Sequence, residues 1–164
     1  MTTPGGLLAR LADLGLTLPT PAAPLAAYVP ARRTGALVLT SGQLPLVDGV
    51  LTATGTVAES ADPSRGVISA EQAQAAARIS MVNCLAAVVS ILDDPDQIAS
   101  VVRVVGYVAS EPGFTGQPGV VNGASLLLLD LFGEQGRHAR SAIGVTALPL
   151  GAPVEVELTV EVRG

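Results

Sequence analysis

The segment from residue 153 to residue 160, PVEVELTV, alternates strictly between apolar and polar side chains. A period of two residues predicts a β-strand that has one apolar face and one polar face. The apolar face carries Val154, Val156, Leu158 and Val160, and the polar face carries Glu155, Glu157, Thr159 and Glu161. An apolar sheet face must be shielded from water. We therefore expect helices to pack on the first face and to leave the acidic face open.

Two segments have the pattern of helices that would cover this sheet. The first runs from Ser69 to about Leu92, is rich in alanine and contains no Gly or Pro. Its start has Ser69 and Gln72 at the spacing of a capping box, in which each side chain binds the other residue's backbone N–H. The second helix begins at QPG, residues 117–119, and ends at Gly133.

Shorter β-rich segments complete the expected sheet. They are residues 36–41, 101–109 and 141–147, and a hairpin or meander is expected around the turn at Asp48-Gly49. The order of strands, helix, strand, helix and two strands favours an α+β fold with one mixed sheet and both helices packed on one face. The uncovered sheet face would need a partner subunit, so we expect a closed homo-oligomer.

The amino-terminal part of the chain is expected to be an addition to this domain. Residues 5–14 place leucines at helical spacing, which predicts a short helix. Residues 17–31 contain four prolines and are expected to form an extended connector. We therefore divide the chain into an N-terminal helix with a Pro-rich connector, residues 1–27, and a main domain, residues 28–164.

Composition argues against several functional classes. The chain has no lysine, so it forms no lysine Schiff base with a substrate or with pyridoxal phosphate, and it has no P-loop lysine. The formal net charge of −5 and the lack of a basic run argue against a nucleic-acid partner. His138 and Cys84 are the only His and Cys residues, too few for the usual zinc site, so we expect no metal.

The cysteine count and the amino-terminal sequence indicate the cellular compartment. A single cysteine forms no intrachain disulfide, which favours a reducing environment. The amino terminus has no basic start followed by a long apolar core, and no uninterrupted apolar stretch reaches about 18 residues. We expect a soluble, cytoplasmic protein without a membrane partner.

An arginine precedes one of the predicted strands. In the segment GRHARSAIGV, residues 136–145, Arg140 lies at the start of that strand. With this segment, several short blocks occur in an order and spacing that resemble the reactive-intermediate deaminase family, also called RidA or YjgF. The blocks are Tyr28, TSGQLPL at 40–46, VN at 121–122, ARS at 139–141, LPLG at 148–151 and VEVE at 154–157. The resemblance covers the chain from residue 28 to residue 162.

This resemblance implies a chorismate-mutase-like α+β fold, a homotrimer with ligand clefts between subunits, and no metal or organic cofactor. It also implies hydrolysis of 2-imino acids, or of their enamine tautomers, to 2-keto acids and ammonia. By the family pattern, Arg140 clamps the substrate carboxylate and Glu155 handles the attacking water. The remaining residues that this pattern places around the substrate are Tyr28, Ser41, Gly42 and Asn122.

The chain departs from the family pattern in two respects. Ala142 stands where many members carry a cysteine that lines the cleft, so the substrate range is expected to differ. The amino-terminal 27 residues and the loop EPGFTGQPG are longer than in compact members. The chain therefore resembles an extended branch of the family.

The proposed chemistry also suits these residue types for reasons that do not depend on the family. A guanidinium binds a carboxylate through two parallel hydrogen bonds, which suits Arg140 to a 2-imino acid. Holding the carboxylate fixes the adjoining C=N carbon about 3 Å from a water that the protein also holds. A glutamate such as Glu155 can orient that water and pass its proton to the departing amine. No strong nucleophile is needed, because imines also hydrolyse in plain water.

Each candidate also has a purely structural interpretation. Arg140 would pair with a glutamate of a neighbouring strand, and Glu155 would be a solvated strand residue. Tyr28 would anchor an interface, Ser41 would shape a turn, and Asn122 would cap or bond the backbone locally.

Two further functional classes stay open. A non-catalytic protein with the same cleft would bind a 2-keto acid or another small carboxylate without converting it. Ribonuclease activity is disfavoured, since phosphodiester cleavage needs a cationic groove and paired acid and base groups. We expect His138 at a solvent-facing loop position rather than as a base, and Cys84 packed and unreactive.

Overall fold

The fold is built on a five-stranded sheet with the strand order β1-β2-β9-β7-β8. The computed structural model describes residues 5–21 and 27–164. The five strands are β1 (Ala31–Thr34), β2 (Leu37–Thr40), β7 (Ile98–Ala109), β8 (Ala139–Val145) and β9 (Val154–Val162). β7 runs antiparallel to β9 and parallel to β8, so the sheet is mixed, as the order of the predicted elements indicated.

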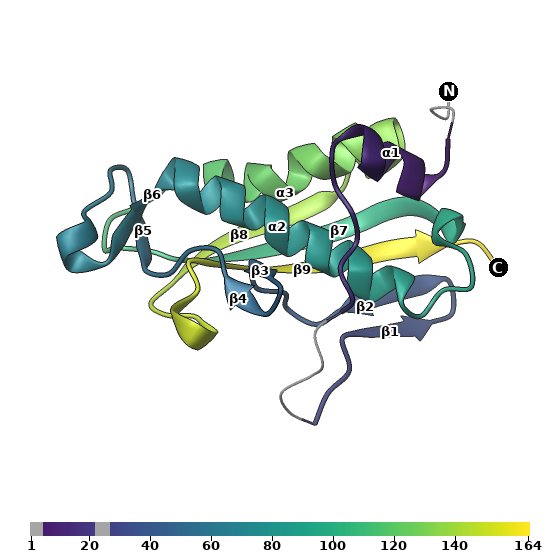
Figure 1. Ribbon diagram of the computed structural model, residues 1–164, viewed down its shortest axis with the longest axis horizontal. Helices are drawn as coiled ribbons and strands as arrows, with labels where there is room; N and C mark the ends of the chain where they lie inside the picture. Colours follow the sequence, from purple (N-terminus) through teal and green to yellow (C-terminus); the bar gives the residue numbers. More distant parts are fainter. Residues whose placement is uncertain (1–4, 22–26) are drawn as a thin grey trace.

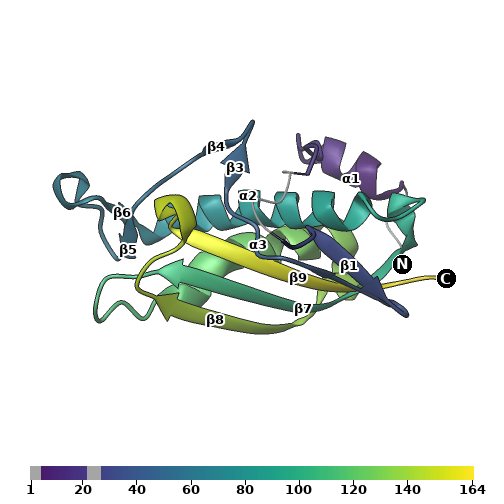
Figure 2. The same ribbon diagram turned by 90° about the horizontal axis from the view of Figure 1, so that it is seen from below.

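Two long helices, α2 (Ala70–Val89) and α3 (Gln117–Phe132), cover one face of this sheet (Figures 1 and 2). The predicted capping box is present at the start of α2, where Ser69 and Gln72 bind each other's backbone N–H. This helix ends earlier than Leu92, because Ile91 and Leu92 bond to carbonyls three residues back and tighten the chain into a turn.

β9 has the two faces that its alternation predicted. Val154, Val156, Leu158 and Val160 are all at most 1% exposed and belong to the hydrophobic core beneath the helices. Glu155, Glu157 and Thr159 on the opposite face are half-buried, and Glu161 is exposed. β9 is thus a central strand with a dry side and a polar side.

Three strands have no counterpart in the sequence analysis. β1 begins at Ala31, which was assigned to the connector, and it pairs with β2 although its sequence ARRT has only one apolar residue. β5 (Thr56–Ala58) and β6 (Val67–Ser69) form a short parallel pair. The expected hairpin at Asp48-Gly49 is present as β3 (Leu46–Val47) and β4 (Val50–Leu51).

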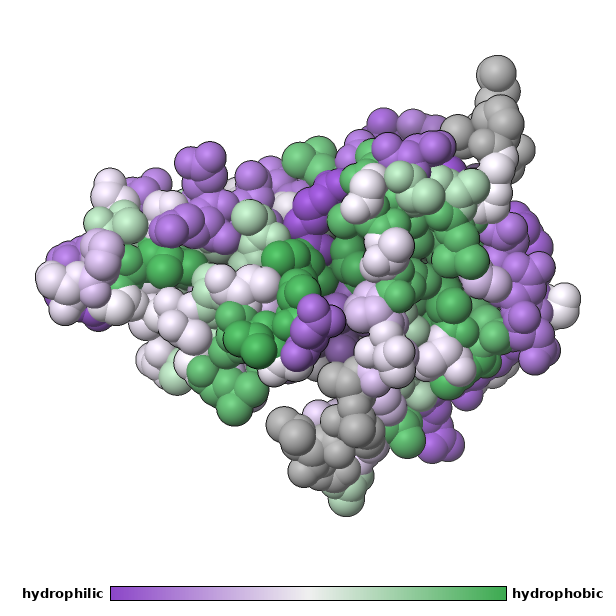
Figure 3. All heavy atoms as spheres, viewed as in Figure 1, coloured by the Kyte–Doolittle hydropathy of each residue, from purple (hydrophilic) through white to green (hydrophobic). Residues whose placement is uncertain are grey.

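The predicted amino-terminal helix is α1 (Leu7–Asp13), and it packs against the end of α3. Leu7 and Leu11 are each 1% exposed and extend the hydrophobic core outward. The following residues, 16–21, form neither helix nor strand, and residues 22–26 of the expected connector lie outside the described residues. Figure 3 shows that apolar surface gathers around α1 and the neighbouring end of α2, with polar surface toward both ends of the molecule.

Cys84 is packed inside the molecule, as the sequence analysis expected. It lies on α2 facing β9, and its Sγ donates to Val156 O at 3.2 Å. Burial is the main cause that raises the pKa of its thiol to about 12. The thiolate, which is the reactive form, is therefore scarce at neutral pH.

α3 lies unusually close to its neighbours because two contact points have no side chain. A Cβ added at Gly123 would overlap the backbone carbonyl of Gln74 in α2. A Cβ added at Gly106 of β7 would overlap the side chain of Val121 in α3. These two glycines set the height of α3 above the sheet and its distance from α2.

We predict that Gly123→Ala lowers the free energy of unfolding by about 1–3 kcal/mol, because the added methyl group pushes α2 and α3 apart. The matched control is Gly119→Ala on the same helix, where an added Cβ has no heavy atom within 4 Å. That change is expected to be neutral or to stabilise by up to about 1 kcal/mol through helix propensity. Urea unfolding of both variants is the measurement, and equal effects would contradict the close contact.

Candidate functional site

Arg140 lies near the start of β8, on the sheet face that the helices cover. Its partner in the β7–β8 ladder is Val104, which is fully buried beneath the helices. Partners in a ladder point to the same face of the sheet. Since β8 is the last strand at this edge, the side chain of Arg140 reaches from the edge toward α3.

Three hydrogen bonds hold the guanidinium of Arg140. Nη1 donates to Asn122 Oδ1 at 2.8 Å and to Ser125 Oγ at 3.1 Å, and Nη2 donates to the backbone oxygen of Pro118 at 3.2 Å. All three acceptors belong to α3 and are uncharged. No ion pair to Arg140 occurs among residues 5–21 and 27–164. The charge is therefore oriented but not neutralised, and two of its five N–H donors have no acceptor in this described part of the chain.

His138 holds the Ser125 hydroxyl in place for Arg140. Its Nδ1 lies 2.6 Å from Gly136 O, and its Nε2 lies 2.9 Å from Ser125 Oγ. Because a carbonyl oxygen only accepts, Nδ1 carries a proton, and an Nε2 without a proton accepts the Ser125 O–H. The Ser125 lone pairs are then free to accept from Arg140. We call Asn122, Ser125, His138 and Arg140 the arginine cluster.

The arginine cluster corrects one expectation and excludes one structural alternative. His138 does not face solvent: it is half-buried and hydrogen-bonded on both ring nitrogens. The Asn122 side chain does not cap the helix, because it binds an arginine 18 positions away. Ser125 was not predicted at the site, although its spacing of three residues from Asn122 places both on one helix face.

A second group of candidates lies on the open face of the sheet. Glu155 pairs with Tyr107 across the β7–β9 ladder and sits between two residues that point into the core. A Cβ added at Gly42 would overlap the Glu155 carboxylate, so this carboxylate lies directly against the Gly42 backbone.

Ser41 joins this group to the segment that carries Tyr28. Its Oγ donates to Val29 O at 2.7 Å, so the hydroxyl makes a long-range link rather than a local turn. Tyr28, the residue before Val29, is 49% exposed. We call Tyr28, Ser41, Gly42 and Glu155 the glutamate cluster.

The surroundings of Glu155 disfavour its charged form. Its pKa is raised, first because the half-buried carboxylate loses hydration and second because Glu157 places a negative charge on the same face. The Tyr107 hydroxyl donates to Glu157 at 3.4 Å rather than to Glu155. A carboxylate with a raised pKa is a stronger base than an ordinary glutamate.

The two clusters do not meet within one chain. Arg140 points to the helix-covered face of the sheet, whereas Glu155 points to the open face. β7 also separates the two strands that carry them. A ligand of the size of a small acid therefore does not contact both groups of the same chain.

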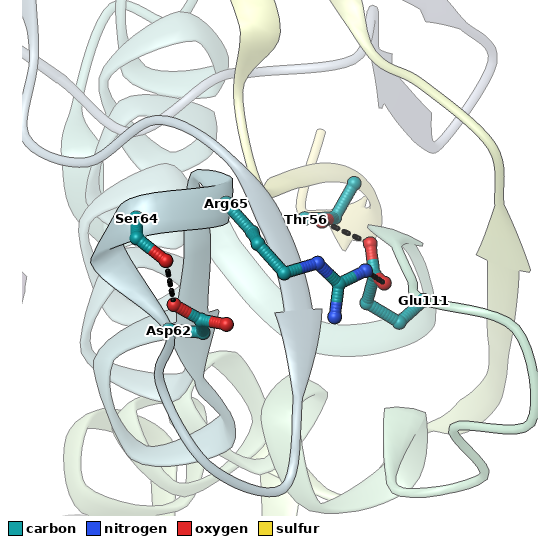
Figure 4. A network of polar contacts seen from close by, with 5 residues as sticks. All are labelled: Thr56, Asp62, Ser64, Arg65 and Glu111. Atoms are coloured by element: carbon teal, nitrogen blue, oxygen red, sulfur yellow. Dashed lines mark hydrogen bonds and ion pairs between the residues drawn. The ribbon is translucent and has the colours of Figure 1, made fainter.

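A separate polar network lies where β5, the turn before β6 and the end of β7 meet (Figure 4). Glu111 accepts from Thr56 Oγ1 at 2.7 Å and from Arg65 Nη2 at 2.7 Å. The Thr56 hydrogen bond is the main cause that lowers the pKa of Glu111, and Arg65 adds to it. Each carboxylate oxygen of Glu111 thus has a donor within the network. We therefore assign the network a structural role, in which it connects these loops.

The described ranges also contain no metal-ligand set, since no three His, Cys, Asp or Glu side chains come together there. None of the helices in those ranges is long and apolar enough to span a bilayer.

Comparison with known proteins gives consistent matches over almost the whole chain. Residues 8–162 match the family described as "YjgF/chorismate mutase-like, putative endoribonuclease". Protein TCP17 of Trypanosoma cruzi is 41% identical over 160 residues, which cover 97% of this chain and 96% of that protein.

Two solved structures have the same fold and similar length. The protein Atu1372 of Agrobacterium tumefaciens, of unknown function, is 41% identical with a TM-score of 0.84, covering 96% of this chain and 92% of that one. A "putative endoribonuclease" from Shewanella oneidensis MR-1 is 30% identical with a TM-score of 0.87, covering 96% of this chain and all of that one.

We predict that Glu155→Gln raises the free energy of unfolding at pH 7 by about 0.5–1 kcal/mol, the size typical of side-chain pairs on a sheet. A raised folded-state pKa means that stability is lost as pH rises and this carboxyl ionises. The difference in the free energy of unfolding between the variant and the wild type should therefore shrink toward pH 4. Chemical unfolding across this pH range is the measurement.

The matched control is Glu59→Gln, which removes an exposed carboxylate elsewhere. It should change stability little at either pH. A Glu155→Gln protein that is less stable than the wild type at pH 7 would contradict the repulsion assigned to Glu155.

Proposed function

The chain belongs to the YjgF/chorismate mutase-like family, and from this premise we propose that it hydrolyses 2-imino acids, or their enamine tautomers, to 2-keto acids and ammonia. The observation that carries this proposal is the state of Arg140. Its guanidinium is fixed by neutral acceptors of α3 and keeps both an unmatched charge and unused donors. Such a group suits a small carboxylate.

The arginine cluster supplies orientation. The carboxylate of a 2-imino acid adjoins the electrophilic carbon, so a bound carboxylate fixes that carbon relative to β8 and α3. Ala142 follows Arg140 by two residues on the same face, so a small, half-buried side chain stands beside the guanidinium. Positioning of this kind is a large part of catalysis for a reaction that already proceeds in water.

The glutamate cluster supplies proton transfer. Glu155 accepts a proton from the attacking water while the oxygen of that water forms a bond to the imine carbon. That proton passes to the imine nitrogen and gives a carbinolamine. Glu155 then takes the proton of the new hydroxyl group and delivers it to the amine, so that the C–N bond breaks and ammonia leaves as the carbonyl forms. Water and imino acid are thereby converted to keto acid and ammonia with no oxidant, and Glu155 regains its starting state.

These two roles require a second copy of the chain. Since Arg140 and Glu155 of one chain lie on opposite sheet faces, we infer that the cleft joins the arginine cluster of one subunit to the glutamate cluster of the next. Exposed Leu39 and Ile143 on the open face suit burial by another copy. A homotrimer, as the family resemblance implies, would contain three such clefts.

A second candidate is binding of a 2-keto acid without turnover. The same unmatched guanidinium favours it, because binding a carboxylate needs Arg140 but not Glu155. Endoribonuclease activity, which the family description carries, has less support here, since the chain has a net charge of −5 and no lysine.

We predict that the protein suppresses the semicarbazide adduct formed when a threonine dehydratase releases its imine product. Arg140→Ala should reduce this effect about 100-fold, since the substrate carboxylate loses its anchor. The control is Arg137→Ala, which removes an exposed arginine that pairs with Glu134. Equal adduct with the wild type and Arg140→Ala would refute imine hydrolysis. Binding of 2-ketobutyrate with unchanged imine lifetime would favour the second candidate.

A mixing experiment tests the intersubunit cleft. Arg140→Ala and Glu155→Gln should each be inactive alone, because every cleft lacks one group. After the two variants are unfolded and refolded together in equal amounts, about a quarter of the clefts of a cyclic trimer should regain both groups. Activity near that fraction supports a shared cleft. No recovery in a mixed trimer verified by mass spectrometry means that one chain supplies both groups.

A further inference from the structure

A cavity of about 350 Å³ lies between α1, the turn before β7, the end of α3 and the end of β9. It shares no lining residue with either cluster, and its lining includes Arg163, which follows the end of β9 (Figure 1). Its polar lining is Arg10, Asp96, Gln135 and Arg163, and its apolar lining includes Leu131 and Phe132. A volume of this size is enough for a small organic molecule.

Arg10 has a buried donor without an acceptor. Its Nη1 donates to Gly5 O at 2.7 Å, and its guanidinium lies over the Phe132 ring at 5.8 Å from the centroid. Its Nε is buried and has no hydrogen-bond partner among residues 5–21 and 27–164. Three further N–H groups, on the two Nη atoms, have no acceptor among the described residues, and they are the donors that Arg10 can offer to a molecule in the cavity.

The charges around the cavity leave one positive charge in excess. Arg10 and Arg163 are the two cations, and Asp96 is the one acid of the lining. The Asp96 carboxylate is already engaged, since Oδ1 accepts from the Leu7 N–H at 2.6 Å. Arg163 donates through Nη1 to the backbone oxygen of Asp96 at 3.2 Å, which leaves most of its donors.

We propose that this cavity binds a small monocarboxylate with an apolar side chain, at a site separate from Arg140. The carboxylate accepts from the Nη donors of Arg10 and from Arg163, and its single charge matches the excess of one. The side chain of the ligand packs against Leu131 and Phe132. Because Arg10 lies on α1 and Arg163 at the end of β9, the ligand joins the amino-terminal helix to the main sheet.

The test uses isovalerate, a branched monocarboxylate, and the Arg140→Ala protein, in which the proposed imine site has lost its anchor. Nε–Hε signals of the arginines are followed by nuclear magnetic resonance during titration. We expect saturable shifts of the Arg10 and Arg163 signals and no shift of the Arg137 signal. The result does not depend on imine hydrolysis, so the two proposals fail separately.

Two variants each remove one of the two cations that line the cavity. Arg10→Gln and Arg163→Gln are each expected to weaken isovalerate binding at least tenfold, whereas Arg137→Gln leaves it unchanged; circular dichroism checks that α1 and the sheet persist. Inorganic phosphate should bind more weakly than isovalerate. Unshifted Arg10 and Arg163 signals, undiminished binding in both folded variants, or equal binding of phosphate would each overturn the proposal.

Discussion

The alternation of side chains along β9 is the constraint on which the rest of the molecule depends. β9 lies between β2 and β7, so its apolar face forms the centre of the core beneath the helices. The same alternation forces Glu155 and Glu157 onto the other face, where no element of the described chain covers them. One strand therefore contributes to both the hydrophobic core and the acidic surface. A shift of its register by one residue would exchange the two faces.

The packing of α3 connects this core to the chemistry of Arg140. Gly106 and Gly123 allow α3 to lie close to the sheet and to α2. Asn122 is the neighbour of Gly123, and Ser125 lies less than one turn farther along the same helix. The height of α3 thus decides whether both side chains reach the guanidinium. The glycine contacts that pack α3 therefore also position Asn122 and Ser125 against the candidate residue Arg140.

The sequence was sufficient for the elements whose pattern is local. The alternation of β9, the capping box at Ser69 and the glycine at the end of α3 each specify their element within a few residues. It was not sufficient for β1, β5 and β6, which have only three or four residues and become strands by pairing, β1 with β2 and β5 with β6. ARRT has no alternation to detect, and only β2 turns it into a strand.

The site divides in the same way. Arg140 and Glu155 were found from residue type and family resemblance, and residue parity places Glu155 on the open face. The tie from Arg140 through Ser125 to His138 depends on a helix and a strand coming together, which no local pattern encodes. A lone histidine before a strand has no feature that distinguishes a solvent-facing ring from one that is bonded at both nitrogens.

The contact between Gly42 and Glu155 has a consequence for substitutions at position 42. A side chain at position 42 would occupy the volume that the carboxylate now fills. The two positions are therefore coupled: a larger residue at 42 requires the Glu155 carboxylate to turn away. The overlapping atoms belong to the outer part of a flexible side chain, so exchange of Gly42 would displace the carboxylate rather than the fold.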